Sequence, residues 1–341
     1  MGTSLVRTSV ALAALAVGLT EFTVSAAAFG QDSATTNQTA SPTAQFPTRA
    51  VRLVEPFGRG GGPDLTARAL APELSKIWHV PVNVDNQPGA GSTLAPKLVA
   101  AAPPDGYTLL VNTSAQAYSA TVAKDLPYDP LAGFIPVSSL SSQAYVFITG
   151  KNTGIKSIRD LIGLAERHQT EITFASMGLG TGSYVGASEL SVIAGLRARH
   201  VPPQPSEAIT DVLRQMIAGR AQYMLAPIPT ALPAITDGSL LALGVSTSRR
   251  SSLVPEVPTI AEVGVSKFDF PIWYGVWAPA GTPANVVGVL ATDIQSALAS
   301  PEMRTWLQEH GAEPMRMTQP EFAQFVVSES KRAVRATSNV L

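Results

Sequence analysis

The feature that most constrains this chain is a repeated order of strand, glycine-rich loop and helix. A strand over 50–57 stops at the glycines of 58–62, and a helix follows. A second strand is expected over 81–84, a second helix over 93–101 and a third strand over 107–111. β-branched and apolar residues mark each strand, and Gly, Pro, Asn and Asp mark the stops. This alternation predicts a parallel sheet with right-handed crossovers.

The alternation is interrupted by two long extended segments. Residues 137–148 form a long extended stretch without a crossover helix, and 270–278 are again extended and are rich in aromatic residues; further strand and helix units lie between them. We therefore expect two α/β lobes joined by two extended crossover segments. The first lobe comprises 48–141 with 270–341, and the second comprises 142–269. A double connection favours a hinge, because the lobes can rotate while both segments flex slightly.

Composition narrows the class of protein. The chain has 341 residues, 45% of them hydrophobic and 14% charged, with 24 basic and 25 acidic side chains. Such a balance supports a real core and lacks the basic footprint of a nucleic-acid binder. There are no cysteines, so disulfides, zinc–thiolate sites and cysteine nucleophiles are excluded.

The amino terminus has the pattern of a signal peptide. Arg7 precedes an apolar run over 10–19, and small residues follow at 25–28. We expect a cleavable signal peptide over 1–28, a flexible leader over 29–47 and a mature protein in the periplasm. An uncleaved membrane anchor is the alternative, but the apolar run is short for a bilayer span.

Three loops share one design, in which a strand end is followed by small residues and then by a helix start. They cover 57–64, 112–116 and 175–183. Helix starts carry unpaired N–H groups and a partial positive charge, and glycine lets the backbone approach an anion. Ser and Thr add hydroxyl donors. Tight turns alone also explain one such loop, whereas two facing a common cleft would clamp a carboxylate.

These loops do not have the pattern of nucleotide sites. No G-x-x-x-x-G-K-[ST] occurs, and Ser183 stands where G-x-G-x-x-G needs its last glycine. We therefore expect no cofactor. No metal site is expected either, because no H-E-x-x-H occurs.

The inventory of catalytic groups is thin, and we predict that the chain is not an enzyme. No serine is flanked as in G-x-S-x-G, and no nucleophile with an adjacent base is evident. Asp64 is better explained as the N-cap of the first helix than as a base.

Individual side chains near the loops have two readings each. Arg59 lies in the first glycine loop, where it can pair with a carboxylate or simply be solvated. Phe57 at a strand end and Tyr145 on a crossover segment are the aromatic residues expected to contact a ligand. Core packing is the alternative for both, and for three further aromatic residues near the expected cleft: Tyr118, Trp273 and Tyr274.

Many short motifs in a fixed order resemble the substrate-binding proteins of tripartite tricarboxylate transporters, the Bordetella uptake gene family. The resemblance runs from about Phe46 to the carboxyl end. The matching residues are Pro56, Phe57, Gly60–62 and Asp64; Asn86 and 88–91; 102–103 and 105–110; 126–130; Phe134 and 136–138; 175–176, Gly178 and Gly180; 257–259, Glu262 and Gly264; and 278–283.

The resemblance implies a type II periplasmic-binding fold that closes on a small organic carboxylate. It implies that Phe57, Gly60 and Gly61 line the first lobe together with Thr113 and Ser114. It further implies a second-lobe lining formed by Ser176, Gly178, Thr181 and Ser183. The expected partner of this monomeric protein is the membrane permease of such a transporter. The alternative is a sensor-kinase ectodomain, because both roles use the same cleft.

Three departures from the family pattern bear on the ligand. Arg59 stands where a proline is common, and 203–206 replace the usual Tyr-Lys-Gly-Gly that follows His-Val-Pro. Ala226 replaces an acidic residue that would pair with a ligand ammonium. We therefore expect a carboxylate without an amino group, of the aromatic or di- or tricarboxylate kind.

Overall fold

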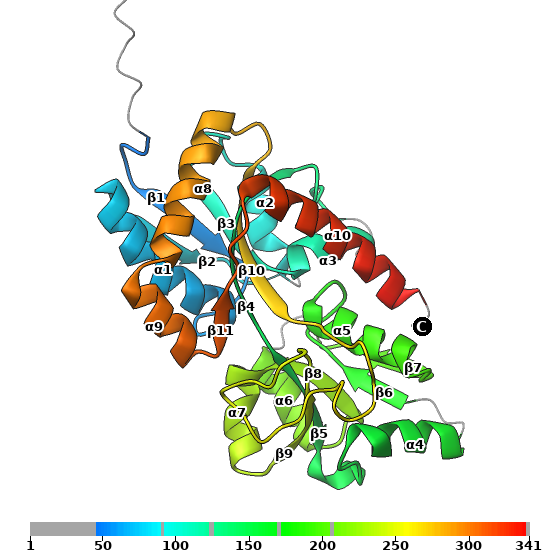
Figure 1. The fold of residues 1–341 in the computed structure, drawn as a ribbon. Helices are drawn as coiled ribbons and strands as arrows, with labels where there is room; N and C mark the ends of the chain where they lie inside the picture. The colour runs from blue at the N-terminus through cyan, green and yellow to red at the C-terminus, as the bar shows by residue number, and fades with distance from the viewer. Residues whose placement is uncertain (1–45, 90–91, 123–125, 169–171, 205–207, 339–341) are drawn as a thin grey trace, which may run out of the picture. The chain divides into compact units, whose positions relative to one another are not determined.

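The computed structural model describes residues 46–89, 92–122, 126–168, 172–204 and 208–338 (Figure 1). All of them belong to one compact unit, Ala44–Leu341. The expected signal peptide over 1–28 lies outside the described residues, as does the expected leader except for its last two residues. Within the described part of the chain, no helix combines the length and apolar character needed to cross a membrane.

The first sheet has six strands in the order β11-β4-β10-β3-β1-β2. β1 pairs in parallel with β2 and β3, as the sequence predicts, whereas β10, β4 and β11 are antiparallel to their neighbours. The sheet is mixed because β4 and β10 belong to the connections with the other sheet. Its strands are β1 Val51–Glu55, β2 Val82–Asn86, β3 Thr108–Thr113, β4 Phe134–Gln143, β10 Ile272–Pro279 and β11 Ala312–Pro314.

The second sheet has five strands in the order β7-β6-β8-β5-β9. β6 is parallel to β7 and β8, and β5 is antiparallel to β8 and β9. Its strands are β5 Tyr145–Gly150, β6 Ile172–Ala175, β7 Ala198–Val201, β8 Tyr223–Pro227 and β9 Leu240–Val245. We call the first sheet with its helices the first lobe, and the second sheet with its helices the second lobe.

Helices connect most of these strands (Figure 1). In the first lobe, α1 packs on α8 and α9, and α10 packs on α3 and β4 before its far end reaches α5 of the second lobe. The first-lobe helices are α1 Gly62–Trp78, α2 Leu94–Ala100, α3 Ala115–Val122, α8 Ala284–Leu298, α9 Pro301–Glu309 and α10 Gln319–Thr337. The second-lobe helices are α4 Ile158–His168, α5 Gly182–Ile193, α6 Ile209–Ile217 and α7 Ile228–Thr236, with a 3₁₀ turn over Lys151–Thr153.

The chain crosses between the sheets twice. It passes from β4 to β5 through Ala144 alone, and it returns from β9 to β10 through 246–271. The prediction of two α/β lobes with two extended connections is therefore confirmed. Phe270, on the return, is fully buried against Tyr118 of the first lobe and Tyr145 of the second. Buried rings at the crossing tie the connections to both cores.

Candidate functional site

The start of α5 meets the first lobe. Gly182, the first residue of α5, is buried and lies against Ser114 at the end of β3 and Tyr145 at the start of β5. A β-carbon at position 182 would overlap the Tyr145 hydroxyl and lie only 3.1 Å from Ser114 Oγ. Only glycine allows this approach. The helix start of the second lobe therefore faces a strand end of the first lobe, as a shared site requires.

A second tyrosine lies against the start of α1 in the same manner. A β-carbon on Gly62, the first residue of α1, would overlap the hydroxyl of Tyr274, which accepts a 2.9 Å hydrogen bond from Gln143 Nε2. Tyr145 lies on β5, the strand that follows the first crossing, and Tyr274 lies on β10, the strand that follows the second. Both side chains are buried. Burial raises the pKa of Tyr145 far above its usual value, and nearby Tyr274 adds to this. Both hydroxyls therefore remain protonated and available as donors.

Ser114 is unusual because its hydroxyl is buried without a hydrogen-bond partner of ordinary geometry in the described structure. The adjacent Tyr145 hydroxyl is near enough that its interaction with Ser114 acts to lower the tyrosine pKa. Most buried hydroxyls in proteins have a full partner, and one without a partner calls for an explanation, of which a role in binding is one. Ser114 combines this property with direct contact to the start of α5.

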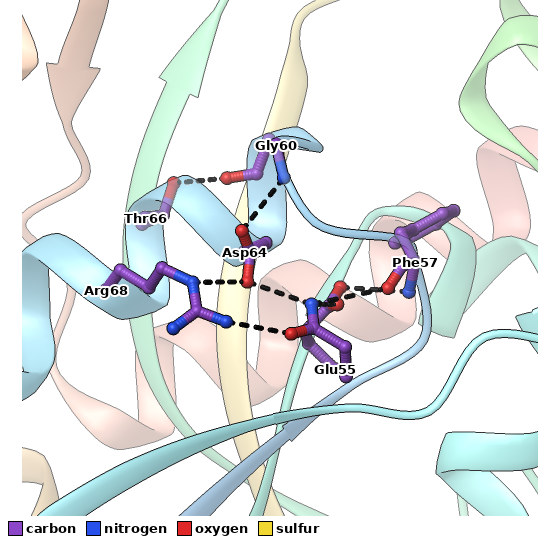
Figure 2. Close-up of polar contacts among 8 residues, drawn as sticks. Glu55, Phe57, Gly60, Asp64, Thr66 and Arg68 are labelled. Atoms are coloured by element: carbon purple, nitrogen blue, oxygen red, sulfur yellow. Dashed lines mark hydrogen bonds and ion pairs between the residues drawn. The ribbon is translucent and has the colours of Figure 1, made fainter.

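The first-lobe loop is built around two buried carboxylates (Figure 2). The Gly60 N–H donates to Asp64 Oδ2 at 2.9 Å, and the Phe57 N–H donates to Glu55 Oε2 at 2.9 Å. Asp64 Oδ1 also accepts from Arg68 Nε at 2.8 Å. The prediction that Asp64 is the N-cap of α1 is wrong, because Gly61 occupies that position with extended backbone. Asp64 lies inside the first turn and reaches back to fold the loop.

Asn86 connects these carboxylates at the end of β2. Its Nδ2 donates to Asp64 Oδ1 at 2.8 Å and also to Glu55 Oε1, while its Oδ1 accepts from Arg68. Burial raises the pKa of Glu55 to about 7, and the charge of Asp64 acts in the same direction. Hydrogen bonds from Phe57 and Asn86 oppose the shift without cancelling it. Two carboxylates thus lie beneath a loop that was expected to attract an anion.

The second-lobe loop is braced by hydroxyl groups instead. Thr181 caps α5 and donates to the Gly178 carbonyl at 2.7 Å, and Ser183 Oγ accepts from the Met177 N–H at 2.9 Å. Thr181 and Ser183 also lie 2.9 Å apart through their hydroxyl oxygens. Because the Thr181 proton already points at Gly178, Ser183 must be the donor in that pair. Both hydroxyl protons are used inside the loop.

These findings change the role expected for several predicted residues. Thr181 and Ser183 were expected to donate to an anion, but in this structure their hydroxyls shape the loop. The Gly60 N–H is taken by Asp64, and the Gly61 N–H donates to the Gly58 carbonyl at 3.2 Å. Membership of these residues in a binding site stays a prediction, and any direct donation would come from other amides of the helix starts.

The remaining predicted residues lie in different surroundings. Phe57 is half-buried, whereas Arg59 is exposed and makes no hydrogen bond or ion pair within the described residues. Thr113 is buried and its Oγ1 accepts from the Ala115 N–H at 3.1 Å, which braces the start of α3. Ser176 is fully buried, and Gly178 is half-buried with a φ of 112°.

His200 is a neighbour of the second-lobe loop that sequence reasoning did not single out. Its Nε2 lies 2.7 Å from Ser176 Oγ, although the two residues are 24 positions apart. Parallel pairing of β6 and β7 places Phe174 beside His200, and Ser176 follows at the strand end. A histidine on a strand adjacent to a glycine-loop strand was the available signal.

An ion pair also joins α5 to the first lobe. Arg332 on α10 donates from Nε and Nη2 to the two oxygens of Glu189 on α5, at 2.8 and 2.7 Å. The same guanidinium donates to the Asp269 carbonyl and lies over the Phe270 ring. Paired donors of this kind are among the stronger protein hydrogen bonds. This contact was missed because nothing in the sequence pairs residues so far apart.

One groove lies beside the crossings rather than at the helix starts. It encloses about 550 Å³ and is bordered by the two connections between the sheets, by α9 and by β11. None of the predicted site residues lines it. The predicted residues of the second lobe, together with Ser114 and Tyr145, are instead mostly buried in contact with one another.

The sequence matches a family described as "Tripartite tricarboxylate transporter family receptor" over residues 66–339. This chain belongs to that family. Protein BugT of Bordetella pertussis is 30% identical to it over 290 residues, which cover 84% of this chain and 88% of BugT. The family is one of receptors, in agreement with the prediction that the chain is not an enzyme.

Solved structures of family relatives share the fold. MatC from Rhodopseudomonas palustris with bound malate is 31% identical with a TM-score of 0.74, and the match covers 85% of this chain and 99% of MatC. R. palustris Rpa4515 with adipate is 30% identical with a TM-score of 0.76, covering 87% of this chain and all of that one. The expected type II periplasmic-binding fold is thereby confirmed.

Proposed function

We propose that this family member is a periplasmic receptor that holds a small organic carboxylate between its two lobes and delivers it to the permease of a tripartite tricarboxylate transporter. The observation that carries the proposal is the meeting of the α5 start with the buried Ser114 hydroxyl, which has no hydrogen-bond partner of ordinary geometry among the described residues. The N–H groups and partial positive charge of a helix start suit a carboxylate. Relatives of the same fold hold malate and adipate.

The proposed site draws on both lobes, with 48–141 and 270–341 forming the first and 142–269 the second. Ser114 and Tyr145 would offer hydroxyls, and the start of α5 would offer amides. The other residues assigned to the proposed site are Phe57, Arg59, Gly60, Gly61, Thr113, Ser176, Gly178, Thr181 and Ser183. The signal peptide expected over 1–28 supports export to the periplasm.

The surroundings favour a carboxylate without an amino group. Ala226, at the end of β8, is buried and pairs with Val146 of β5, so this strand end offers no carboxylate to an ammonium. The carboxylates of Glu55 and Asp64 already accept hydrogen bonds at each oxygen. Dicarboxylates, tricarboxylates and aromatic acids therefore fit better than amino acids.

Isothermal titration with malate, adipate, citrate, benzoate, aspartate and glutamate tests the ligand class. We expect binding of at least one acid without an amino group. Binding of aspartate or glutamate alone would overturn the preference, and the absence of any binding would overturn the carboxylate proposal.

Ser114→Ala tests the site itself. Loss of one hydrogen bond from Ser114 to the bound acid should weaken affinity by about 1 kcal/mol, roughly fivefold. Ser141→Ala is the matched control, because Ser141 Oγ is the other buried hydroxyl without a partner among the described residues and lies on β4. Equal affinities for wild type and Ser114→Ala would remove Ser114 from the site.

A further inference from the structure

His200 occupies a pocket that keeps its ring neutral and fixed. The ring stacks at a tilt on Phe174, with centroids 5.2 Å apart, and meets Tyr184 of α5 edge-on at 4.9 Å. Burial lowers the pKa of His200 to about 4. Tyr184 is the titratable group among these ring contacts, and burial raises its pKa. At neutral pH the imidazole is therefore uncharged.

The hydrogen bonds of Ser176 decide which nitrogen of His200 carries the proton. Ser176 Oγ accepts from the Gly178 N–H at 3.0 Å and lies 2.7 Å from His200 Nε2. If Nε2 carried the proton, Ser176 would accept twice, and its own buried proton would have no acceptor among the described residues. The consistent arrangement has the proton on Nδ1, with Ser176 donating to Nε2.

This arrangement controls the backbone of the loop before α5. Gly178 has a φ of 112°, and its N–H is held by Ser176 while its carbonyl is held by Thr181. Both ends of this turn are thus fixed by hydroxyls, and the first hydroxyl is oriented by His200. The turn leads directly into the helix start at Gly182.

We propose that His200 is a positioning residue of the binding site, which acts through Ser176 to aim the loop over 176–183 without touching the bound acid. The inference rests on the proposed function, because the loop is assigned to the site there. According to this inference, binding also requires the neutral Nε2 of His200 on β7 as a hydrogen-bond acceptor for Ser176.

Two substitutions at position 200 separate positioning from packing. His200→Phe keeps an aromatic ring between Phe174 and Tyr184 but offers no acceptor to Ser176. His200→Gln gives up the ring but can place an amide oxygen near the position of Nε2. Malate and adipate are titrated into each variant at pH 7, with His310→Phe, at the residue that caps the end of α9, as a control. Amide hydrogen exchange over 176–184 is measured by mass spectrometry without added acid.

We expect His200→Phe to weaken the binding of whichever acid the wild type takes by roughly five- to tenfold. It should also speed exchange over 176–184, whereas His200→Gln restores both values to within about twofold of the wild type. Wild-type affinity and exchange in His200→Phe would overturn the inference, and Ser114→Ala would then still report on the proposed function. If neither acid binds the wild type, the titration is repeated with whichever acid of the wider panel does bind; if none binds, the proposed function fails and the exchange comparison alone decides the positioning role.

Discussion

The loop before α1 and the loop before α5 have the same sequence design but different chemistry. In the first lobe the loop amides of Phe57 and Gly60 are held by buried carboxylates, Glu55 and Asp64. In the second lobe the equivalent braces are neutral: hydroxyls of serine and threonine, and an uncharged His200. Glycine and a helix start are therefore not sufficient to make an anion site, because the groups beneath the loop set its charge.

The comparison assigns unequal roles to the two helix starts. Electrostatic attraction to a carboxylate is strongest where no fixed negative charge lies nearby. The groups that brace the second-lobe loop carry no charge, and the loop leads to Gly182, which touches Ser114 of the first lobe. We therefore expect most of the binding free energy to arise at the start of α5 and Tyr145 beside it, with the first lobe contributing Ser114 and the enclosing surface.

The largest effect should come from filling the contact at the start of α5. In Gly182→Ala the new methyl group collides with the Tyr145 hydroxyl and presses on Ser114. Overpacking of this kind destabilises a packed contact by about 1–3 kcal/mol, and because this contact belongs to the proposed binding arrangement, affinity should fall by roughly five- to more than a hundredfold. Titration with malate and adipate measures the loss.

Gly58→Ala is the matched control in the first-lobe loop. A β-carbon at Gly58 would meet nothing within 4 Å, and its backbone needs no positive φ. This variant should bind as the wild type does. The unequal roles are refuted if Gly182→Ala keeps its affinity, or if Gly58→Ala loses as much as Gly182→Ala does. Thermal unfolding of both variants shows whether any loss reflects an unfolded protein.

The buried carboxylate Glu55 of the first lobe and the neutral His200 of the second should change the free energy of unfolding with pH in opposite directions. Glu55 has a folded pKa of about 7 against an ordinary 4.5, so the folded state binds more protons and stability falls as pH rises between these values. His200 has a folded pKa of about 4 against 6.5, so the folded state binds fewer protons and stability rises over that window. In the wild type the two contributions should largely cancel from pH 4.5 to 6.5.

Removing one group should expose the slope of the other. His200→Gln should lose up to about 3 kcal/mol of unfolding free energy as pH rises through this range, and Glu55→Gln should gain a similar amount. Urea unfolding at half-unit pH steps gives both slopes, and the constant offset from altered hydrogen bonds does not affect them. If the free energy of unfolding changed with pH in the same way in both variants, Glu55 and His200 would not have the opposite pKa shifts on which the comparison rests.

The order of elements and the crossings could be predicted from the sequence, because strand, glycine and helix signals are local. The hydrogen-bond partners of the residues in each loop could not be predicted. Asp64 fits the pattern of an N-cap, but Gly61, with extended backbone, occupies that position. The Asp64 carboxylate instead accepts a hydrogen bond from the Gly60 N–H. Ser176 meets His200 only through the pairing of β6 with β7. Hydroxyl direction, carboxylate pKa and contacts between lobes all depend on such pairings, which a single sequence does not display.

The smallest effect should come from Arg59, the charge that the first-lobe loop itself presents. Its side chain is exposed, so solvent and salt screen its attraction to a bound acid. Arg59→Gln should therefore weaken malate or adipate binding by about twofold at low ionic strength, and the difference should vanish by about 0.5 M salt. A tenfold loss that persists in high salt would place the guanidinium in direct contact with the acid. The first lobe would then offer the acid a cation of its own, and the expectation that the start of α5 supplies most of the binding free energy would be refuted.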